Sequence, residues 1–272
     1  MTANPQVLRS SAWYRALGVD LYDGLYAWRL WTMLGWNDIL QRYRRSYLGP
    51  FWMTISMGAL VAALGSIYSH LFHVEIETYL PYLTLGFVAW NMISTSLKES
   101  CQAFRKRADL MKQIKVPFST YVLRVVWGNL IVLAHTAIIF IPISLYFGQW
   151  PKPVALLAIP GLVLLSLNLV WIGLVLAVLD TRFPDVSLMV ETVLQIAVFM
   201  TPIMWPVSAL GERAFVADIN PFHHLIEVVR APLLGDTAAA LSWIVVVAMV
   251  VMGALLAVLL FRRVEQRLVY WL

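Results

Sequence analysis

Charged side chains are scarce in this sequence of 272 residues, and so are cysteines. Asp, Glu, Lys and Arg make up 13% of the chain, whereas soluble domains carry about 25%. Hydrophobic residues account for 61%, and the mean hydropathy is +0.76. Because so few charges cannot cover a globule of this size in water, the composition excludes an ordinary soluble enzyme. The single cysteine, Cys101, excludes an internal disulfide framework.

Motifs that carry enzyme chemistry are also missing. No lysine is followed by Ser or Thr, so the chain lacks a nucleotide-binding loop of the G-x-x-x-x-G-K-[ST] type. It also lacks H-E-x-x-H, G-x-S-x-G and a cysteine pair for zinc. We therefore expect no catalytic residue, metal or cofactor in this chain. His135 and Glu191 are thin support for ion-coupled transport, so energy for any transport is expected from another subunit.

Six long uncharged runs dominate what is present. Each has 20 or more residues, enough for a helix to cross the hydrocarbon core of a bilayer. They cover 46–74, 78–97, 125–151, 153–179, 192–211 and 237–261. We predict an all-α integral membrane protein with six transmembrane helices. Its parts are a cytoplasmic N-terminal segment (1–49), a transmembrane domain (50–265) and a cytoplasmic tail (266–272).

The basic residues are distributed unevenly between the predicted loops. Of the 20 Lys and Arg residues, all but Lys152, Arg213 and Arg230 fall on the side that holds both termini. Because basic residues are retained on the cytoplasmic side, both termini are predicted to be cytoplasmic. A pI near 9.4 would suggest nucleic acid for a soluble protein. Here the positions of the charges indicate membrane lipids instead, with no nucleic-acid partner.

Residues 36–47 predict an amphipathic helix that lies in the inner membrane interface. One helical face carries apolar and aromatic side chains, namely Trp36, Ile39, Leu40, Tyr43 and Tyr47. Asp38 and Arg42 lie four residues apart on the opposite face, where we expect them to form an ion pair. Gly49-Pro50 then ends the helix. Two interpretations remain open, a simple membrane anchor or a role in admitting substrate.

Two cytoplasmic loops differ in character. Residues 101–118 are strongly basic with a small apolar stripe at Leu110, Met111 and Ile114. This loop is either a solvated topology signal or a short helix that docks on a cytoplasmic partner. The loop 180–185, DTRFPD, is so short and charged that we expect it to pack against protein.

The outer segment 205–235 is too polar to span the membrane and too apolar for a free loop. Asn220-Pro221 predicts a helix start, because proline favours the first helical position. We predict two short re-entrant helices that dip in from the outer face, where protein or a water-filled cavity covers their backbone. His223 and His224 point in different directions on a helix, so we interpret them as interfacial polar residues rather than metal ligands.

Several segments in order resemble one family. They are WNDILQRYRRSYLGPFW at 36–52, KVPFSTYVLR at 115–124, LDTRFPDV at 179–186, MTPIMWP at 200–206 and NPFHHLIEVVRAPLLG at 220–235. This set is similar to ABC type-2 permeases that export cell-surface polysaccharides, with O-antigen lipopolysaccharide permeases as the nearest branch. Capsular polysaccharide and teichoic-acid permeases share the architecture and remain alternatives. Residues 1–30 match nothing in this pattern.

The resemblance implies a division of labour between subunits. A homodimer of the permease would pair with two copies of a cytoplasmic ABC ATPase, which bind ATP and magnesium. The substrate would be a polyprenyl-diphosphate-linked polysaccharide, and the membrane would be a bacterial inner membrane. The basic loop would contain the coupling helix, for which the candidate residues are Arg105, Arg107, Leu110, Met111, Ile114 and Lys115.

The same resemblance implies that substrate enters at the interface helix. Basic residues attract anionic groups at headgroup depth, which makes Arg42, Arg44 and Arg45, with Trp36 and Tyr43, the candidates for substrate access. The outer helices would form a periplasmic gate, with the candidates Asn220, Pro221, Phe222, Glu227 and Arg230.

A polysaccharide can slide past aromatic rings, so aromatic residues in the spans are candidates to line a channel. They are Tyr68, Tyr82, Trp90, Phe140, Trp171, Phe199 and Trp205, although such residues also form lipid-facing belts. The uncharged polar residues within the spans should face helices or the channel rather than lipid, namely Asn91, Asn129, Asn168 and Gln195. Two other classes remain: an ABC-2 exporter of drugs or small lipids, and a membrane-embedded transferase, for which no convergent acids are found.

Overall fold

The computed structural model describes residues 17–271, apart from 45, 46, 48, 50, 114, 115 and 149–151. Within these residues every regular element is a helix. The α-helices are α1 (Leu17–Tyr26), α2 (Trp28–Tyr43), α3 (Phe51–Phe72), α4 (Ile76–Cys101), α5 (Ala108–Gln113), α6 (Phe118–Ala137), α7 (Phe140–Tyr146), α8 (Ala158–Arg182), α9 (Val186–Met200), α10 (Phe215–Ile219), α11 (Pro221–Leu234) and α12 (Ala240–Trp271). Short 3-10 turns are η1 (Arg105–Arg107), η2 (Pro153–Leu157) and η3 (Val207–Arg213).

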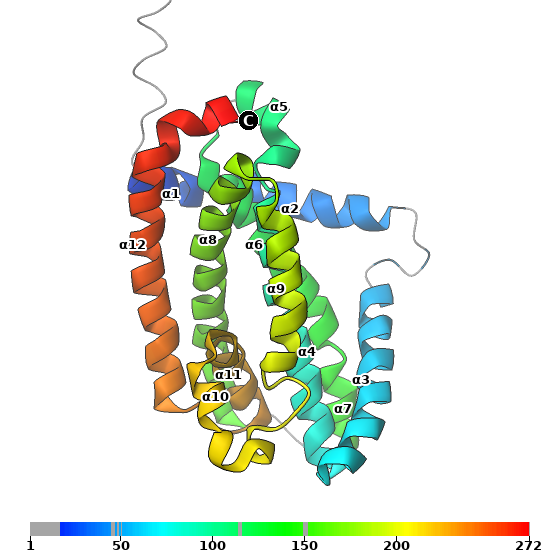
Figure 1. The fold of residues 1–272 in the computed structure, drawn as a ribbon. Coiled ribbons are helices and arrows are strands. Elements are labelled where there is room, and N and C mark those ends of the chain that lie inside the picture. Colours follow the sequence, from blue (N-terminus) through cyan, green and yellow to red (C-terminus); the bar gives the residue numbers. More distant parts are fainter. Residues whose placement is uncertain are drawn as a thin grey trace, which may run out of the picture.

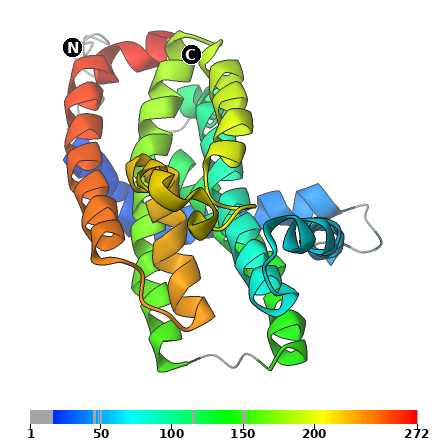
Figure 2. The ribbon, with the colours of Figure 1, turned by 60° about the horizontal axis from the view of Figure 1, so that its bottom comes forward.

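The long helices stand side by side, and shorter elements close the two ends of the bundle (Figure 1). At one end, α1 and α2 lie across the bundle, and α5 and the C-terminus lie close to that end. At the other end, α10 and α11 fold against the long helices, as the rotated view in Figure 2 also shows. The two ends therefore correspond to the two polar regions that the sequence separates.

Among the residues that the structure describes, four helical segments are long and apolar enough to cross a membrane. They are Phe51–Phe72, Phe118–Tyr146, Pro153–Arg182 and Ala240–Val264. The helix α4 is also long, but 17 of its 26 residues are buried within the protein. Because its neighbours are other helices, α4 tolerates more polar residues than a lipid-facing helix does. The chain is therefore a multi-pass, all-helical membrane protein.

The fifth predicted span differs from the structure. The uncharged run 192–211 does not form one helix, because α9 begins earlier, at Val186, and ends at Met200. Pro202 lies two residues after Met200 and cannot donate a backbone hydrogen bond, so the helix stops before it. Of the 15 residues of α9, only Leu194 and Ala197 are buried. The polar residue Gln195, expected to face other helices, is exposed in the single chain.

The interface helix is longer and placed differently than predicted. It is α2, which begins at Trp28 rather than Trp36 and ends at Tyr43, because residues 28–36 contain no proline and the helix accommodates Gly35. The buried residues on α2 are Gly35 and Ile39, whereas Trp36 is 49% exposed. Gly49 adopts a positive φ of 52°, which agrees with the predicted turn at this position.

The start of the outer helix α11 is confirmed, but its polar residues are not interfacial. Asn220 caps α11 by accepting a hydrogen bond from the backbone N–H of Phe222. His223 and His224 were expected to be interfacial polar residues, yet both are less than a tenth exposed, as is the gate candidate Arg230. His224 makes hydrogen bonds with the Ser242 hydroxyl of α12 and the Asp218 carbonyl of α10.

Candidate functional site

The candidate site begins where α2 crosses α6. A Cβ added to Gly35 would lie 3.0 Å from the carbonyl oxygen of Arg124, so the glycine permits a close approach of the two backbones. The Trp31 and Trp127 rings pack edge to face beside it, with centroids 5.8 Å apart. This contact fixes α2 across α6 and brings Asp38, one turn further on, to Arg124 of α6.

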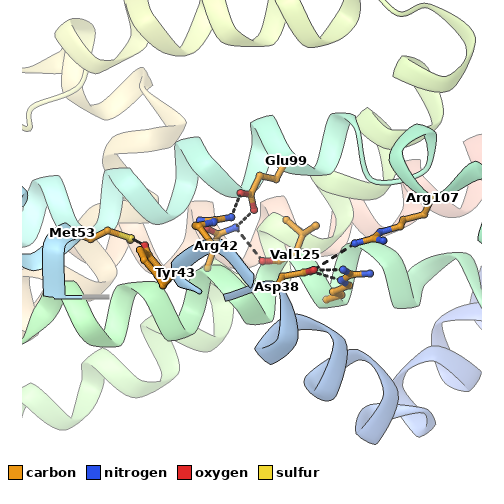
Figure 3. Close-up of polar contacts among 9 residues, drawn as sticks. Asp38, Arg42, Tyr43, Met53, Glu99, Arg107 and Val125 are labelled. Atoms are coloured by element: carbon orange, nitrogen blue, oxygen red, sulfur yellow. Dashed lines mark hydrogen bonds and ion pairs between the residues drawn. The ribbon is translucent and has the colours of Figure 1, made fainter. Parts of the chain in front are cut away.

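Asp38 is the centre of an ion-pair network that joins three elements (Figure 3). Its carboxylate accepts hydrogen bonds from Nε and Nη2 of Arg124 on α6. Arg107 of η1 lies 3.5 Å from the same carboxylate. The predicted ion pair between Asp38 and Arg42 is therefore wrong, because Arg124 offers two parallel donors in a buried position.

Arg42 turns instead toward α4. Its guanidinium donates to Glu99 across a distance of 2.6 Å, as Figure 3 shows. The other Glu99 oxygen accepts from Asn129 Nδ2 at 2.9 Å, and Asn129 also donates to the Val125 carbonyl at 3.1 Å. Asn129 is 2% exposed, which confirms the expectation that this polar span residue faces protein.

Two cavities flank α2. The first, of about 400 Å³, lies between α2, α4, α6 and η1. Its buried wall includes Tyr121, Arg124 and Asn129, and its more exposed wall includes Arg42 and Arg107. Residues predicted for substrate access and for coupling thus border one space.

The second cavity, of about 510 Å³, lies on the other side of α2. Trp36, Tyr43, Arg44 and His135 line it. Partial burial raises the pKa of the Tyr43 hydroxyl, which donates to the Met53 sulfur and so ties α2 to the start of α3. The structure therefore divides the predicted access residues between two cavities, and Arg45 lies outside the described residues.

The predicted coupling segment forms η1 and α5. Arg105 donates to the fully buried Asp180 at 2.7 Å, and Asp180 also accepts from the backbone N–H of Ser187 at 3.0 Å. The loop 180–185 is thus packed against protein through Asp180, as expected, although Phe183 is 57% exposed.

The apolar stripe of the coupling segment does not face outward. Met111 is 6% exposed, and Leu110 packs against the same hydrophobic core. The stripe therefore fixes α5 to the rest of this chain, and the exposed side chains of α5 are polar, such as Lys112 and Gln113. Ile114 and Lys115 lie outside the described residues, and the coupling role stays a prediction.

The helix α1 lies among the N-terminal residues to which the sequence pattern assigned no role. It stabilises this end of the bundle. Asp20 of α1 is 4% exposed and accepts hydrogen bonds from the backbone N–H groups of Phe118 and Ser119, at 2.7 and 2.8 Å. These are the first N–H groups of α6, which have no partner within their own helix. A carboxylate from a distant helix thus caps α6.

The predicted channel aromatics lie in different surroundings in the single chain. Trp90 is buried edge to face against Phe222, and Tyr68 stacks on Phe72. Tyr82 donates to the Pro202 carbonyl, whereas Phe199 is 66% exposed. The remaining members are Phe140, Trp171 and Trp205, all partly exposed. Their channel role stays a prediction.

Two of the predicted gate residues, Arg230 and Glu227, form an outer cluster with Pro202 and Tyr82. The Arg230 guanidinium is 1% exposed, donates to Glu227 at 2.6 Å and to the Pro202 carbonyl at 2.8 Å, and lies 3.9 Å from the centroid of the Tyr82 ring. It connects α11 with α4 and with the end of α9. Pro221, at the first position of α11, and Phe222 complete the set.

Comparison with known proteins agrees with this architecture. The ABC-2 type transporter family matches residues 29–234, so the chain belongs to this family of membrane transport proteins. It is 25% identical over 213 residues to the O-antigen export system permease protein RfbA of Myxococcus xanthus, covering 76% of this chain and 82% of the relative. Two Klebsiella pneumoniae proteins of the same name are 21% and 22% identical, each covering 75% of this chain and 80% of the relative.

The sequence reasoning missed Asp38, Glu99, Tyr121 and Arg124 as members of a site. Arg124 was counted only as a cytoplasmic positive charge. The sequence feature that could have identified Arg124 as a site residue is its position inside an apolar helix, since a charge there requires a partner. No sequence signal identified that partner, because Asp38 lies 86 residues away.

Proposed function

We propose that the chain is the permease subunit of an ABC transporter that exports a polyprenyl-diphosphate-linked polysaccharide, specifically lipopolysaccharide O-antigen. The observation that carries this proposal is the family match over residues 29–234 together with relatives named O-antigen export permeases. ATP hydrolysis on a separate subunit, which binds ATP and magnesium, would drive transport. The permease itself would contribute no ATPase site.

The proposed membrane arrangement has six spans, both termini in the cytoplasm and α10–α11 as re-entrant helices. The helix α4 supplies the length of a fifth span, and α9 with the segment after it supplies the sixth. Exposed polar residues on α9, among them Glu191, Thr192 and Gln195, support a second copy of the permease, because lipid is an unfavourable neighbour for them. Two ATPase subunits would dock beside η1 and α5.

Substrate is proposed to enter beside α2 at Arg42, Arg44 and Arg45. The physical reason is that basic residues near an anionic surface each contribute about 1 kcal/mol. The exposed side chains of Arg42 and Arg44 support this role. These three arginines are not needed to set the membrane topology, because many other basic residues already lie on the same side.

The test reconstitutes the permease with its ATPase subunit in proteoliposomes that contain polyprenyl-diphosphate-linked glycan. We expect ATP-dependent transfer of the glycan to the opposite leaflet, measured by protection from a glycosidase. Replacing Arg42, Arg44 and Arg45 by Gln should abolish both transfer and stimulation of the ATPase by this lipid. Replacing Arg213, at the other end of the molecule, by Gln should change neither.

Capsular polysaccharide, teichoic acid and small lipids or drugs are the competing substrates within the same family. Deleting the gene separates them: loss of surface O-antigen with normal sensitivity to drugs supports the proposal. Unchanged O-antigen together with increased drug sensitivity would instead indicate efflux.

A further inference from the structure

The cavity between α2, α4, α6 and η1 carries an excess of positive charge. Four cationic side chains line it, Arg42, Lys106, Arg107 and Arg124, against the two carboxylates of Asp38 and Glu99. Lys106 forms no ion pair with any part of the chain that the structure describes, and Arg107 lies at the long distance of 3.5 Å from Asp38. The charges of this cavity therefore do not balance within the chain.

A buried hydroxyl in the same wall lacks a partner. Tyr121 lines the cavity and is 3% exposed, and among the described residues its hydroxyl has no hydrogen-bond partner. Arg107 and Arg124 are the cations that act electrostatically on this hydroxyl. A buried polar group without a hydrogen bond is costly and calls for an explanation such as a bound ligand.

We propose that this cavity binds a phosphate or diphosphate group. Guanidinium groups present paired donors that match phosphate oxygens, an ammonium group adds a point charge, and a tyrosine hydroxyl can donate the remaining hydrogen bond. At about 400 Å³ the cavity has room for such a group. Its source is either the headgroup of a lipid or a phosphate compound in free solution.

Exposure decides which side chains can turn to the ligand. The side chains of Arg42 and Arg107 are each 43% exposed, so they can leave Glu99 and Asp38 at little cost. Arg124, whose side chain is 8% exposed, stays on Asp38 and presents a fixed positive charge to the ligand. The anion would thereby join α2, α6 and η1.

The inference rests on the proposed function only where the lipid-borne diphosphate of the exported substrate is the ligand. Binding is measured on the intact permease in phosphatidylcholine nanodiscs, with inorganic diphosphate as the free probe and undecaprenyl diphosphate as the lipid probe. We expect saturable binding that raises the melting temperature. The double variant Lys106→Gln with Arg107→Gln should weaken it by roughly tenfold or more, and Tyr121→Phe should weaken it several-fold.

Matched controls separate the cavity from general charge and folding effects. Arg213→Gln removes a positive charge at the opposite end, and Tyr270→Phe removes a hydroxyl from an 89% exposed side chain. Both should bind like the parent protein. If Tyr121→Phe lowers the melting temperature without ligand, the exposed Lys106 and Arg107 variant still provides the test.

Each outcome has one meaning. Binding of inorganic diphosphate that the cavity variants weaken supports a site for a free phosphate group, and binding of undecaprenyl diphosphate alone supports a lipid headgroup site. No saturable binding of either probe, or equal binding by variants and parent, overturns the inference. Export by a permease that fails this assay leaves the proposed function intact, whereas cavity-dependent binding without export leaves the site intact and removes the function.

Discussion

Two buried arginines, at opposite ends of the bundle, occupy very different surroundings. Arg230 is 1% exposed, and its partners are a carboxylate on its own helix, a backbone carbonyl and an aromatic ring. Arg124 is 7% exposed, and its partner Asp38 comes from a helix 86 residues earlier in the chain. Arg124 also borders a cavity of about 400 Å³.

The difference shows two uses of a buried charge in a membrane protein. Arg230 has every side of its guanidinium covered by fixed groups, so it holds α4, α11 and the end of α9 together. The Asp38–Arg124 pair lies in a network with half-exposed members and open space beside it. In such a network, a side chain can leave its ion-pair partner and bind a ligand or a moving element instead. In the outer cluster the groups are fixed, so the contacts of Arg230 are either kept or lost.

The largest effect is expected at the outer cluster. Arg230→Met leaves Glu227 and the Pro202 carbonyl without their donor in a buried position, so we expect the free energy of unfolding to fall by about 3 kcal/mol. Thermal unfolding of the purified permease in detergent measures this loss. Arg213→Met, at an exposed site near the same end, is the control. A loss no greater than that of the control would show that Arg230 does not hold the outer helices.

A smaller effect is expected at the inner network. Asp38→Asn weakens charge-assisted hydrogen bonds to Arg124 and should cost about 2 kcal/mol, measured in the same way against Asp109→Asn, which is exposed.

A double-mutant cycle sharpens this prediction. Asp38 and Arg124 should show a clear coupling free energy, because the two side chains share hydrogen bonds. Asp38 and Arg42, the pair that sequence spacing suggested, should show none. Coupling in the second cycle and not in the first would contradict the observed arrangement of α2.

The smallest effect on stability is expected for Arg42→Gln. Its ion pair with Glu99 joins side chains that are 43% and 31% exposed, and such pairs contribute at most about 1 kcal/mol. The melting temperature should therefore stay close to that of the parent, while lipid-stimulated ATPase activity of the reconstituted complex falls. A loss of stability equal to that of Asp38→Asn would assign Arg42 a structural role instead.

Much of the fold could be predicted from hydropathy, and the exceptions have identifiable causes. The uncharged run 125–151 placed the start of the third span too late. The corresponding helix, α6, begins at Phe118 and contains Arg124. A charged residue is unfavourable in a membrane-spanning helix only when it has no partner, and Asp38 is the partner of Arg124. The run 192–211 predicted a helix end too late, because lack of charge does not prevent Pro202 from ending α9.

The candidate site was predicted less completely than the fold. Arg42 and Arg107 were both identified, but for separate roles and not as neighbours. Their common cavity depends on α2 lying across α6, which Gly35 permits and no periodicity in α2 reveals. Helical spacing gave Arg42 as the partner of Asp38, and it failed because a buried bidentate donor binds a carboxylate better than an exposed one on the same helix does.

The sequence by itself determined that the chain is a helical membrane protein without its own nucleotide-binding loop. The physical reason is that a backbone in lipid must satisfy its hydrogen bonds internally, so long apolar runs become helices whatever surrounds them. Only the tertiary structure decided which charges meet, that Asp20 caps α6 and that Met111 faces inward. Those outcomes depend on how helices pack, and packing joins residues that lie far apart in the chain, whose spacing in the sequence carries no record of the contact.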